Sequence, residues 1–85
     1  MTFTVRLTKR AEKDLAKIAK REGERIRIAL RALEKNPYPP AARKLINRPE
    51  WRVRIGKYRI FYEVIDNEVV VLVIGIGLRW QIYDR

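Results

Sequence analysis

The hydrophobic period of this chain changes once, at a proline-rich segment, and this change limits the fold more than any other feature. Before Pro37, apolar residues recur at helical spacing in two segments separated by Gly23. After Pro39-Pro40, apolar residues alternate with polar ones or form short runs, which is typical of strands. A chain of 85 residues has room for one domain, residues 1–85, so both halves must share a core.

Turn and cap signals divide these halves into elements. A strand is expected at residues 3–7, and Thr8 is a candidate N-cap for the first of two helices, of which the second covers residues 24–35. The strands expected after the prolines are a stub at 44–46 and long strands at 51–55, 58–65 and 68–76. Two-residue turns at 56–57 and 66–67 make them an antiparallel meander. The predicted fold is α+β, in the order β-α-α-β-β-β, with a helical hairpin packed on one face of an antiparallel sheet.

The charge balance is strongly basic. Twenty Lys and Arg residues against ten Asp and Glu residues give a formal net charge of +10 and a pI of about 10.5. Such an excess predicts an anionic partner: nucleic acid, an acidic protein or an acidic membrane surface. No apolar run approaches the roughly 18 residues of a membrane span, and the N-terminus lacks a signal-peptide core. We therefore expect a cytoplasmic protein without a membrane partner.

The absence of two residue types excludes several chemistries. The chain has no Cys and no His. A disulfide framework, thiolate or imidazole metal ligands, and Ser-His or Cys-His catalytic arrangements are therefore excluded. The acidic residues Glu63, Asp66 and Glu68 fit a strand and a turn better than a metal site, so no metal is expected.

The expected register of the first hairpin brings like charges together. A two-residue turn at Gly56-Lys57 pairs Arg54 with Arg59 and Arg52 with Phe61. Like charges directly opposite each other destabilise a strand pair by up to about 1 kcal/mol. The pairing therefore predicts a phosphate site on this face, with Phe61 as a ring on which a base could stack.

The second hairpin places apolar residues on the same face. A two-residue turn there pairs Phe61 with Leu72 and Arg59 with Ile74. Val70, Leu72 and Ile74 then lie on the side that the helices do not cover. Either the C-terminal tail covers these residues, or they form a docking site for a partner.

From residue 44 onward the sequence resembles the RelE branch of the RelE/ParE toxin superfamily. The residues that carry the resemblance are Lys44-Leu45, the run WRVRIGKYRIFYE at 51–63, the valine-rich segment 69–74, Gly77-Leu78-Arg79 and Tyr83. The preceding strand and helical hairpin match the order of elements in the family. The resemblance implies a metal-independent and cofactor-independent endoribonuclease that cuts mRNA in the ribosomal A site and is held inactive by a cognate antitoxin.

The resemblance also implies roles for individual residues. Arg59 would clamp the phosphorane, Arg79 would clamp it or assist the leaving group, and Tyr83 would stack on a base or align the 2′-hydroxyl. Arg52 and Arg54 would neutralise the RNA backbone. The further candidates are Lys44, Arg48, Lys57 and Phe61 for RNA binding, and Val70, Leu72 and Ile74 for antitoxin binding.

Two departures from the family pattern leave the general base open. Relatives often have Lys where this chain has Arg52 and Arg54, and arginine stays protonated at neutral pH. Many relatives have His at the position of Leu78. Two other functions stay open: a ParE-like toxin that poisons DNA gyrase, and a non-catalytic nucleic-acid-binding module. The presence of the arginine cluster together with Tyr83 favours the nuclease.

Overall fold

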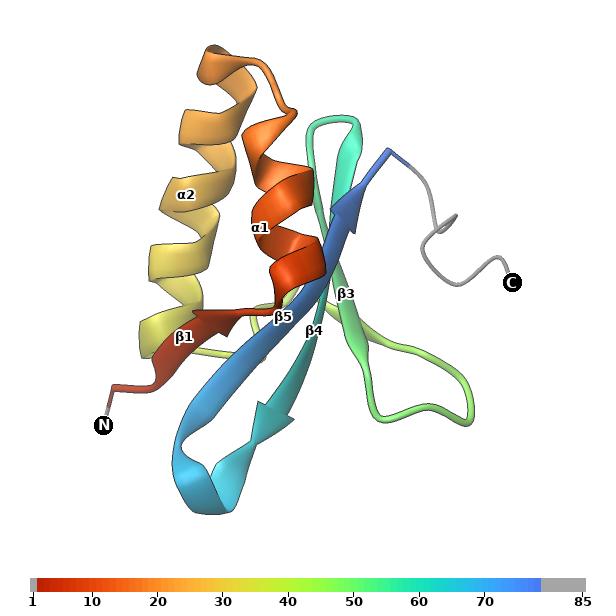
Figure 1. Cartoon of the computed structure of the whole chain (residues 1–85). Helices are drawn as coiled ribbons and strands as arrows, with labels where there is room; N and C mark the ends of the chain where they lie inside the picture. The colour runs from red at the N-terminus through yellow and green to blue at the C-terminus, as the bar shows by residue number, and fades with distance from the viewer. Residues whose placement is uncertain (1, 79–85) are drawn as a thin grey trace.

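The computed structural model describes residues 2–78, which form a five-stranded sheet and two helices (Figure 1). The elements are β1 (Thr4–Leu7), α1 (Lys9–Ala16), α2 (Lys20–Lys35), β2 (Arg43–Lys44), β3 (Trp51–Ile55), β4 (Tyr58–Ile65), the 3-10 helix η1 (Asp66–Glu68) and β5 (Val70–Gly77). The strand order is β1-β5-β4-β3-β2. Neither helix in this part of the chain is long and apolar enough to cross a membrane.

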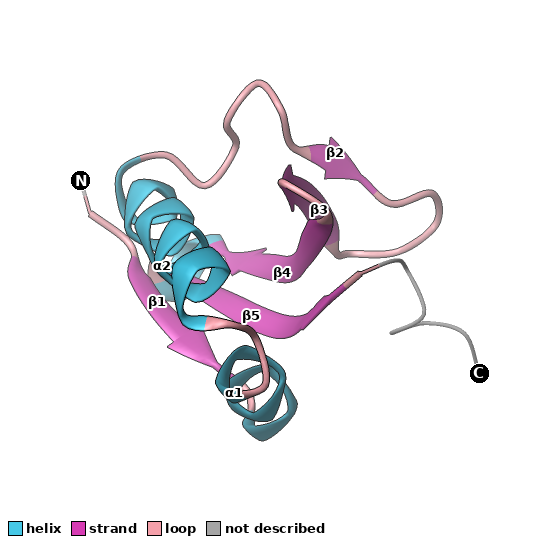
Figure 2. Ribbon diagram, turned by 90° about the horizontal axis from the view of Figure 1, so that it is seen from above, coloured by secondary structure: helices cyan, strands magenta, loops and turns pink. Residues whose placement is uncertain are grey.

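Seen from above, α2 covers one face of the sheet, whereas α1 lies along β5 beyond the end of β1 (Figure 2). The predicted α+β class and the order β-α-α-β-β-β are confirmed. The sheet, however, is mixed, because β1 pairs parallel with β5 while the other neighbours are antiparallel. The helices carry the chain from β1 to the far edge, and the meander then returns, so that β5 meets β1 in the same direction.

The first helix begins where the sequence predicts and ends earlier. Thr8 is the N-cap of α1, and its hydroxyl accepts a hydrogen bond from the Ala11 N–H at 3.1 Å. The break between the helices lies at residues 17–19, not at Gly23, because α1 tightens there: the Ile18 N–H donates to the Leu15 carbonyl oxygen at 3.1 Å. Gly23 is instead a buried residue of α2.

The core lies between α2 and the sheet. It contains Ile26, Leu30 and Leu33 from α2, and Val53, Ile60, Tyr62, Val71, Val73 and Ile76 from the three central strands. The hydroxyl of the buried Tyr62 donates to the Pro37 carbonyl oxygen at 2.8 Å. Burial, with a smaller contribution from Tyr38, raises the pKa of Tyr62 to about 12. The sheet face expected to contact the helices is therefore the one that does.

The first hairpin has the predicted register, with Arg54 opposite Arg59 and Arg52 opposite Phe61. Gly56 in its turn has φ +61°, a left-handed conformation that glycine adopts without strain.

The predicted register of the second hairpin is wrong. Its loop has four residues, 66–69, because η1 adds a helical turn closed by a hydrogen bond from the Val69 N–H to the Asp66 carbonyl oxygen. A register shift then occurs between Phe61 and Tyr62. Phe61 therefore pairs with Gly75 rather than with Leu72.

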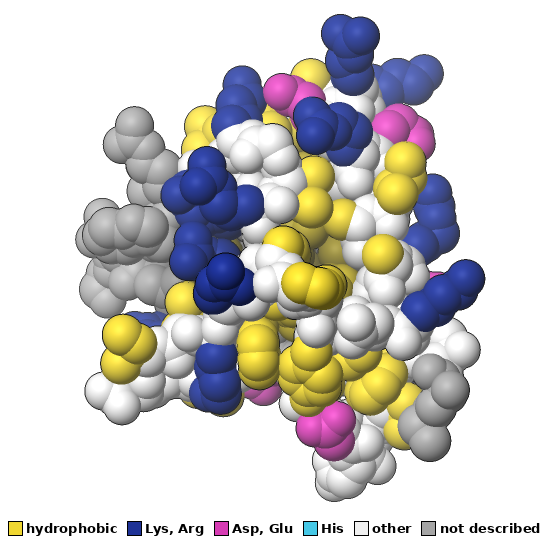
Figure 3. Space-filling view, turned by 180° about the vertical axis from the view of Figure 1, so that it is seen from behind, with side chains coloured by type: hydrophobic (Ala, Val, Ile, Leu, Met, Phe, Trp, Pro, Cys, Tyr) yellow, Lys and Arg dark blue, Asp and Glu magenta, His cyan; other side chains and the backbone are white. Residues whose placement is uncertain are grey.

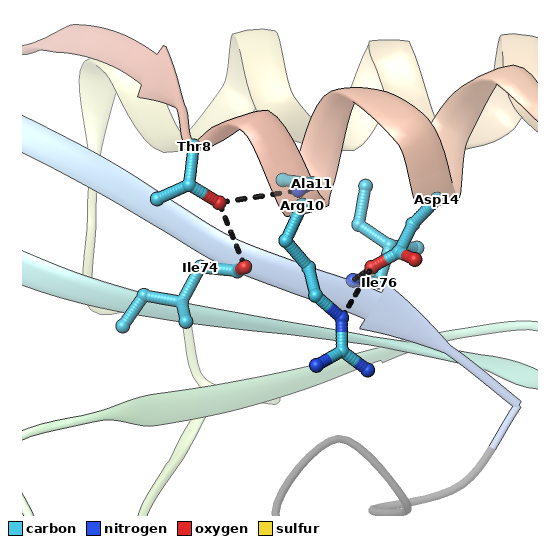
Figure 4. A network of polar contacts seen from close by, with 6 residues as sticks. All are labelled: Thr8, Arg10, Ala11, Asp14, Ile74 and Ile76. Carbon is cyan, nitrogen blue, oxygen red and sulfur yellow. Dashed lines mark hydrogen bonds and ion pairs between the residues drawn. The ribbon is translucent and has the colours of Figure 1, made fainter.

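Side chains of α1 take over as partners of β5 where β1 ends (Figure 4). Thr8 Oγ1 donates to the Ile74 carbonyl oxygen at 2.9 Å. Asp14 Oδ2 accepts from the Ile76 N–H at 3.0 Å and lies 3.7 Å from Arg10 Nε. Backbone groups at a sheet edge need partners when they are partly buried, so α1 fixes the last part of β5 in place.

Candidate nucleic-acid interface

Three of the predicted site residues lie on the side of the sheet that faces away from the helices. Arg52 and Arg54 come from β3 and Arg59 from β4, and their side chains alternate with core residues such as Val53 and Ile60. Arg54 is exposed, and Arg52 and Arg59 are half-buried. Within residues 2–78, no acidic side chain lies within 4.0 Å of these guanidinium groups. The structure thus brings the three positive charges together without a neutralising acidic partner among the described residues.

A fourth arginine belongs to the same group and was missed by the sequence analysis. Arg43 in β2 pairs with Arg52 across the strands. Its Nη1 donates to the carbonyl oxygens of Pro40 and Ala42, at 2.8 and 3.0 Å. The strand stub was expected at 44–46, and no pairing with the next strand was predicted for it. We call Arg43, Arg52, Arg54 and Arg59 the arginine face.

Arg59 is the most constrained member of the arginine face. Its Nη1 donates to the Leu78 carbonyl oxygen at 2.9 Å, just beyond the end of β5. Its Nε is buried and has no hydrogen-bond partner among the described residues. Arg59 lies opposite Gly77, not opposite Ile74 as expected, so no side chain faces it from β5. Its orientation is therefore fixed, and it retains a buried donor that an acceptor could engage.

Phe61 is more buried than the sequence predicts. Its side chain is on the face of the sheet opposite the helices, as expected, but it is 0% exposed. A ring without accessible surface offers no platform to a base. Stacking of Phe61 on RNA therefore stays a prediction, and it requires that the ring become accessible.

The predicted RNA-binding lysines do not join the arginine face. Lys44 pairs with Trp51 and so lies on the opposite side of the strand, where its Nζ donates to the Arg48 carbonyl oxygen at 2.6 Å. Lys57, in the turn between β3 and β4, lies 3.8 Å from a carboxylate oxygen of Glu22 on α2. Arg48 is exposed in the loop between β2 and β3.

The remaining candidates fall in two groups. Val70, Leu72 and Ile74 are each half-buried, and Ile74 lies at the irregularity of β5. Arg79 and Tyr83 lie outside the described residues. No group of three Asp or Glu side chains within residues 2–78 is placed to hold a metal ion.

Positive charge is not confined to the arginine face. Seen from behind, Lys and Arg side chains gather along both sides of the molecule, and few acidic side chains interrupt them (Figure 3). Hydrophobic side chains occupy the middle and lower part of this view. A surface of this kind attracts polyanions at long range.

The sequence of this chain matches those of known toxins over most of its length. Residues 5–83 match the family model described as the ParE toxin of the type II toxin-antitoxin system parDE. The chain belongs to the RelE/ParE toxin superfamily. This toxin is also 30% identical to a Methanocaldococcus jannaschii protein named as toxin RelE1, over 89 aligned positions that cover 100% of this chain and 99% of that protein.

Solved structures of RelE proteins share the fold of this toxin. The chain is similar to one in the RelBE2 toxin-antitoxin complex of Mycobacterium tuberculosis, with a TM-score of 0.82, 26% identity, and coverage of 93% of this chain and 100% of that one. It is also similar to one in the archaeal RelE-RelB complex of Pyrococcus horikoshii, with a TM-score of 0.81, 26% identity, and coverage of 91% and 94%. The chain is likewise similar to one in the intact E. coli RelBE complex, with a TM-score of 0.79, 29% identity, and coverage of 88% of this chain and 94% of that one.

Proposed function

We propose that this toxin is a ribosome-dependent mRNA endoribonuclease of the RelE type. The observation that carries the proposal is the arginine face, where Arg52, Arg54 and Arg59 crowd together without an acidic partner within residues 2–78. Guanidinium groups in this arrangement suit the phosphate diester of RNA, which they can contact through two parallel hydrogen bonds. The similarity of the chain to RelE proteins supports the same function.

The proposed reaction needs little from the protein besides alignment and charge. The 2′-hydroxyl of RNA gives up its proton and its oxygen attacks the adjacent phosphorus. The bond to the 5′-oxygen breaks and that oxygen takes up a proton, so the products are a 2′,3′-cyclic phosphate and a 5′-hydroxyl. The arginine face would stabilise the charge that develops on the phosphorane, a form of electrostatic catalysis. Arg59, already held by the Leu78 carbonyl, would need little reorganisation to act as the clamp. Arg79 and Tyr83 remain proposed members of the site.

The cellular setting follows from the same proposal. The substrate would be mRNA on the cytoplasmic ribosome, and the inhibitor would be a cognate antitoxin protein, as in the RelBE complexes to which the chain is similar. The half-buried residues Val70, Leu72 and Ile74 remain the proposed antitoxin contact.

The decisive experiment is the mapping of RNA ends. Purified toxin is added to ribosomes programmed with a short mRNA, and the 3′ ends of the fragments are tested for a cyclic phosphate. We expect cuts within the A-site codon, and we expect Arg59→Ala to abolish them while Lys57→Ala does not. Intact mRNA in the presence of active ribosomes would refute the proposal.

A ParE-like gyrase poison is the second candidate, because the matching family model is that of ParE. A gyrase poison acts by binding protein and does not depend on a phosphate-binding cluster. DNA breaks linked to gyrase after induction, together with intact mRNA, would support this alternative. The same outcome should then survive the Arg59→Ala substitution.

A further inference from the structure

The solvent-exposed side of α2 is unusually basic. Nine residues of α2 are exposed, of which six are Lys or Arg and one, Glu24, is acidic. The six basic residues are Lys20, Arg21, Arg25, Arg27, Arg31 and Lys35. In Figure 3, Lys and Arg side chains follow the side of the molecule where α2 lies. We call these six residues the α2 basic face.

The α2 basic face has no neutralising partner within the described part of the chain. The ion pairs there join Arg10 to Asp14 and Lys57 to Glu22, and none includes a member of this face. Arg27, Arg31 and Lys35 follow one another at intervals of four residues, so like charges are neighbours along the helix. Each such pair costs a few tenths of a kcal/mol (about 0.2–0.5). An anionic ligand would remove this cost.

The position of α2 separates this face from the arginine face. Because α2 packs its buried residues, such as Ile26 and Leu33, against the sheet, its exposed side points away from it. The arginine face lies on the other side of the sheet, and the molecule measures 33 × 27 × 25 Å. One short RNA strand bound at Arg59 would not also lie along α2. The molecule thus has two separate surfaces for anions.

We propose that the α2 basic face binds the sugar-phosphate backbone of structured RNA, so that the toxin bridges two RNA segments. This inference rests on the proposed function: the arginine face holds the mRNA, and α2 holds ribosomal RNA beside it. Contacts to backbone phosphates position a protein without reading sequence, which is what a docking surface on the ribosome requires. Ribosome dependence then follows from the second surface.

The composition of the α2 basic face favours phosphate over an acidic protein. Four of its six members are arginine, the residue best suited to phosphate oxygens. The exposed apolar residues of α2 are Ile28, which is 58% exposed, and its neighbour Ala32. Two such residues make a small apolar centre for a protein interface, which commonly buries about 800 Å² on each partner.

The test compares two triple substitutions that remove the same charge at the same spacing. The first, Arg27→Gln, Arg31→Gln and Lys35→Gln, acts on α2. The matched control, Lys9→Gln, Lys13→Gln and Lys17→Gln, acts on residues of α1 and the segment after it that are also exposed. Glutamine keeps a helix propensity close to that of Lys and Arg, so both variants should fold. The probes are 70S ribosomes programmed with mRNA, an RNA duplex of about 20 base pairs, and poly-glutamate.

We expect the α2 variant to lose affinity for ribosomes and duplex RNA by at least about tenfold, and its salt dependence to fall by about two in log-log slope. The control variant should lose much less affinity and keep most of its salt dependence. Equal losses in the two variants would overturn the inference, because net charge alone would then explain them. Unchanged RNA binding with weaker poly-glutamate binding would also overturn it, in favour of an acidic protein. Failure of the wild type to cleave ribosome-bound mRNA would instead refute the proposed function, whatever the α2 variant binds.

Discussion

Arg54 and Arg59 face each other across β3 and β4, and no acidic side chain within residues 2–78 pairs with either guanidinium group. The two residues differ in their surroundings. Arg54 is exposed, whereas Arg59 is half-buried and donates to the Leu78 carbonyl oxygen at 2.9 Å. Both residues therefore take part in the charge repulsion, but of the two only Arg59 also makes a hydrogen bond within the described residues.

This difference predicts unequal effects on stability. Arg54→Ala should raise the free energy of unfolding by up to about 1 kcal/mol, because it removes a facing like charge. Arg59→Ala removes the same repulsion but also a hydrogen bond of about 1 kcal/mol, so the two terms should nearly cancel. Urea denaturation measures both. A loss of more than about 2 kcal/mol in Arg54→Ala would contradict the assignment of repulsion to this pair.

The contacts between α1 and the end of β5 predict that two substitutions by alanine lower the free energy of unfolding. Thr8→Ala should lower the free energy of unfolding by about 1–2 kcal/mol, since it removes the helix cap and the bond to Ile74. Asp14→Ala leaves the Ile76 N–H without its partner and should cost about 1–3 kcal/mol. Lys13→Ala, on the exposed side of α1, is the control and should have little effect. If Thr8→Ala and Asp14→Ala lower the free energy of unfolding no more than Lys13→Ala does, these contacts do not stabilise the fold.

The buried phenol of Tyr62 predicts a loss of stability at high pH. Its pKa is raised from 10.0 to about 12, so the folded state disfavours the phenolate. The stabilising effect is complete below pH 10 and is lost as the pH rises through 12, at a slope that approaches about 1.4 kcal/mol per pH unit. Tyr62→Phe should lack this part of the pH dependence. The difference between the two unfolding curves at several pH values measures it.

Two glycines predict opposite outcomes for the same substitution. Gly23→Ala should stabilise by up to about 1 kcal/mol, because alanine favours helices and the new Cβ, 3.2 Å from Arg27 Nη1, meets only the movable end of an exposed side chain. Gly56→Ala should destabilise by about 1 kcal/mol, since φ is +61° there. Gly56→Asn should cost less, because asparagine tolerates this conformation. Thermal melting of the three variants tests the assignment.

The sequence predicted most of the fold because its signals are local. The alternation in residues 51–65 and the Gly56-Lys57 turn define the first hairpin, and with it the pairing of Arg54 with Arg59. The register of the second hairpin was predicted wrongly, because Asp66-Asn67 also suits the start of a 3-10 turn. This turn makes the loop two residues longer than expected. The parallel pairing of β1 with β5 joins residues more than 60 positions apart, for which a strand pattern contains no information.

The candidate site was predicted unevenly for similar reasons. Arg52, Arg54 and Arg59 followed from register alone. Arg43 was missed because β2 has two residues and a weak pattern. The full burial of Phe61 was not predicted, because an aromatic residue on the side away from the helices was expected to be open to solvent, and burial depends on tertiary packing.

The hydrogen bond between Arg59 and Leu78 also has a practical consequence for labelling. Leu78 lies beside the arginine face, whereas Phe3 is held near the end of α2 by a bond from its N–H to the Glu34 carbonyl oxygen, at the opposite end of the molecule (Figure 1). A fluorophore attached at position 78, which is exposed, would lie beside that face. One attached at Thr2, next to Phe3, would leave the arginine face unobstructed.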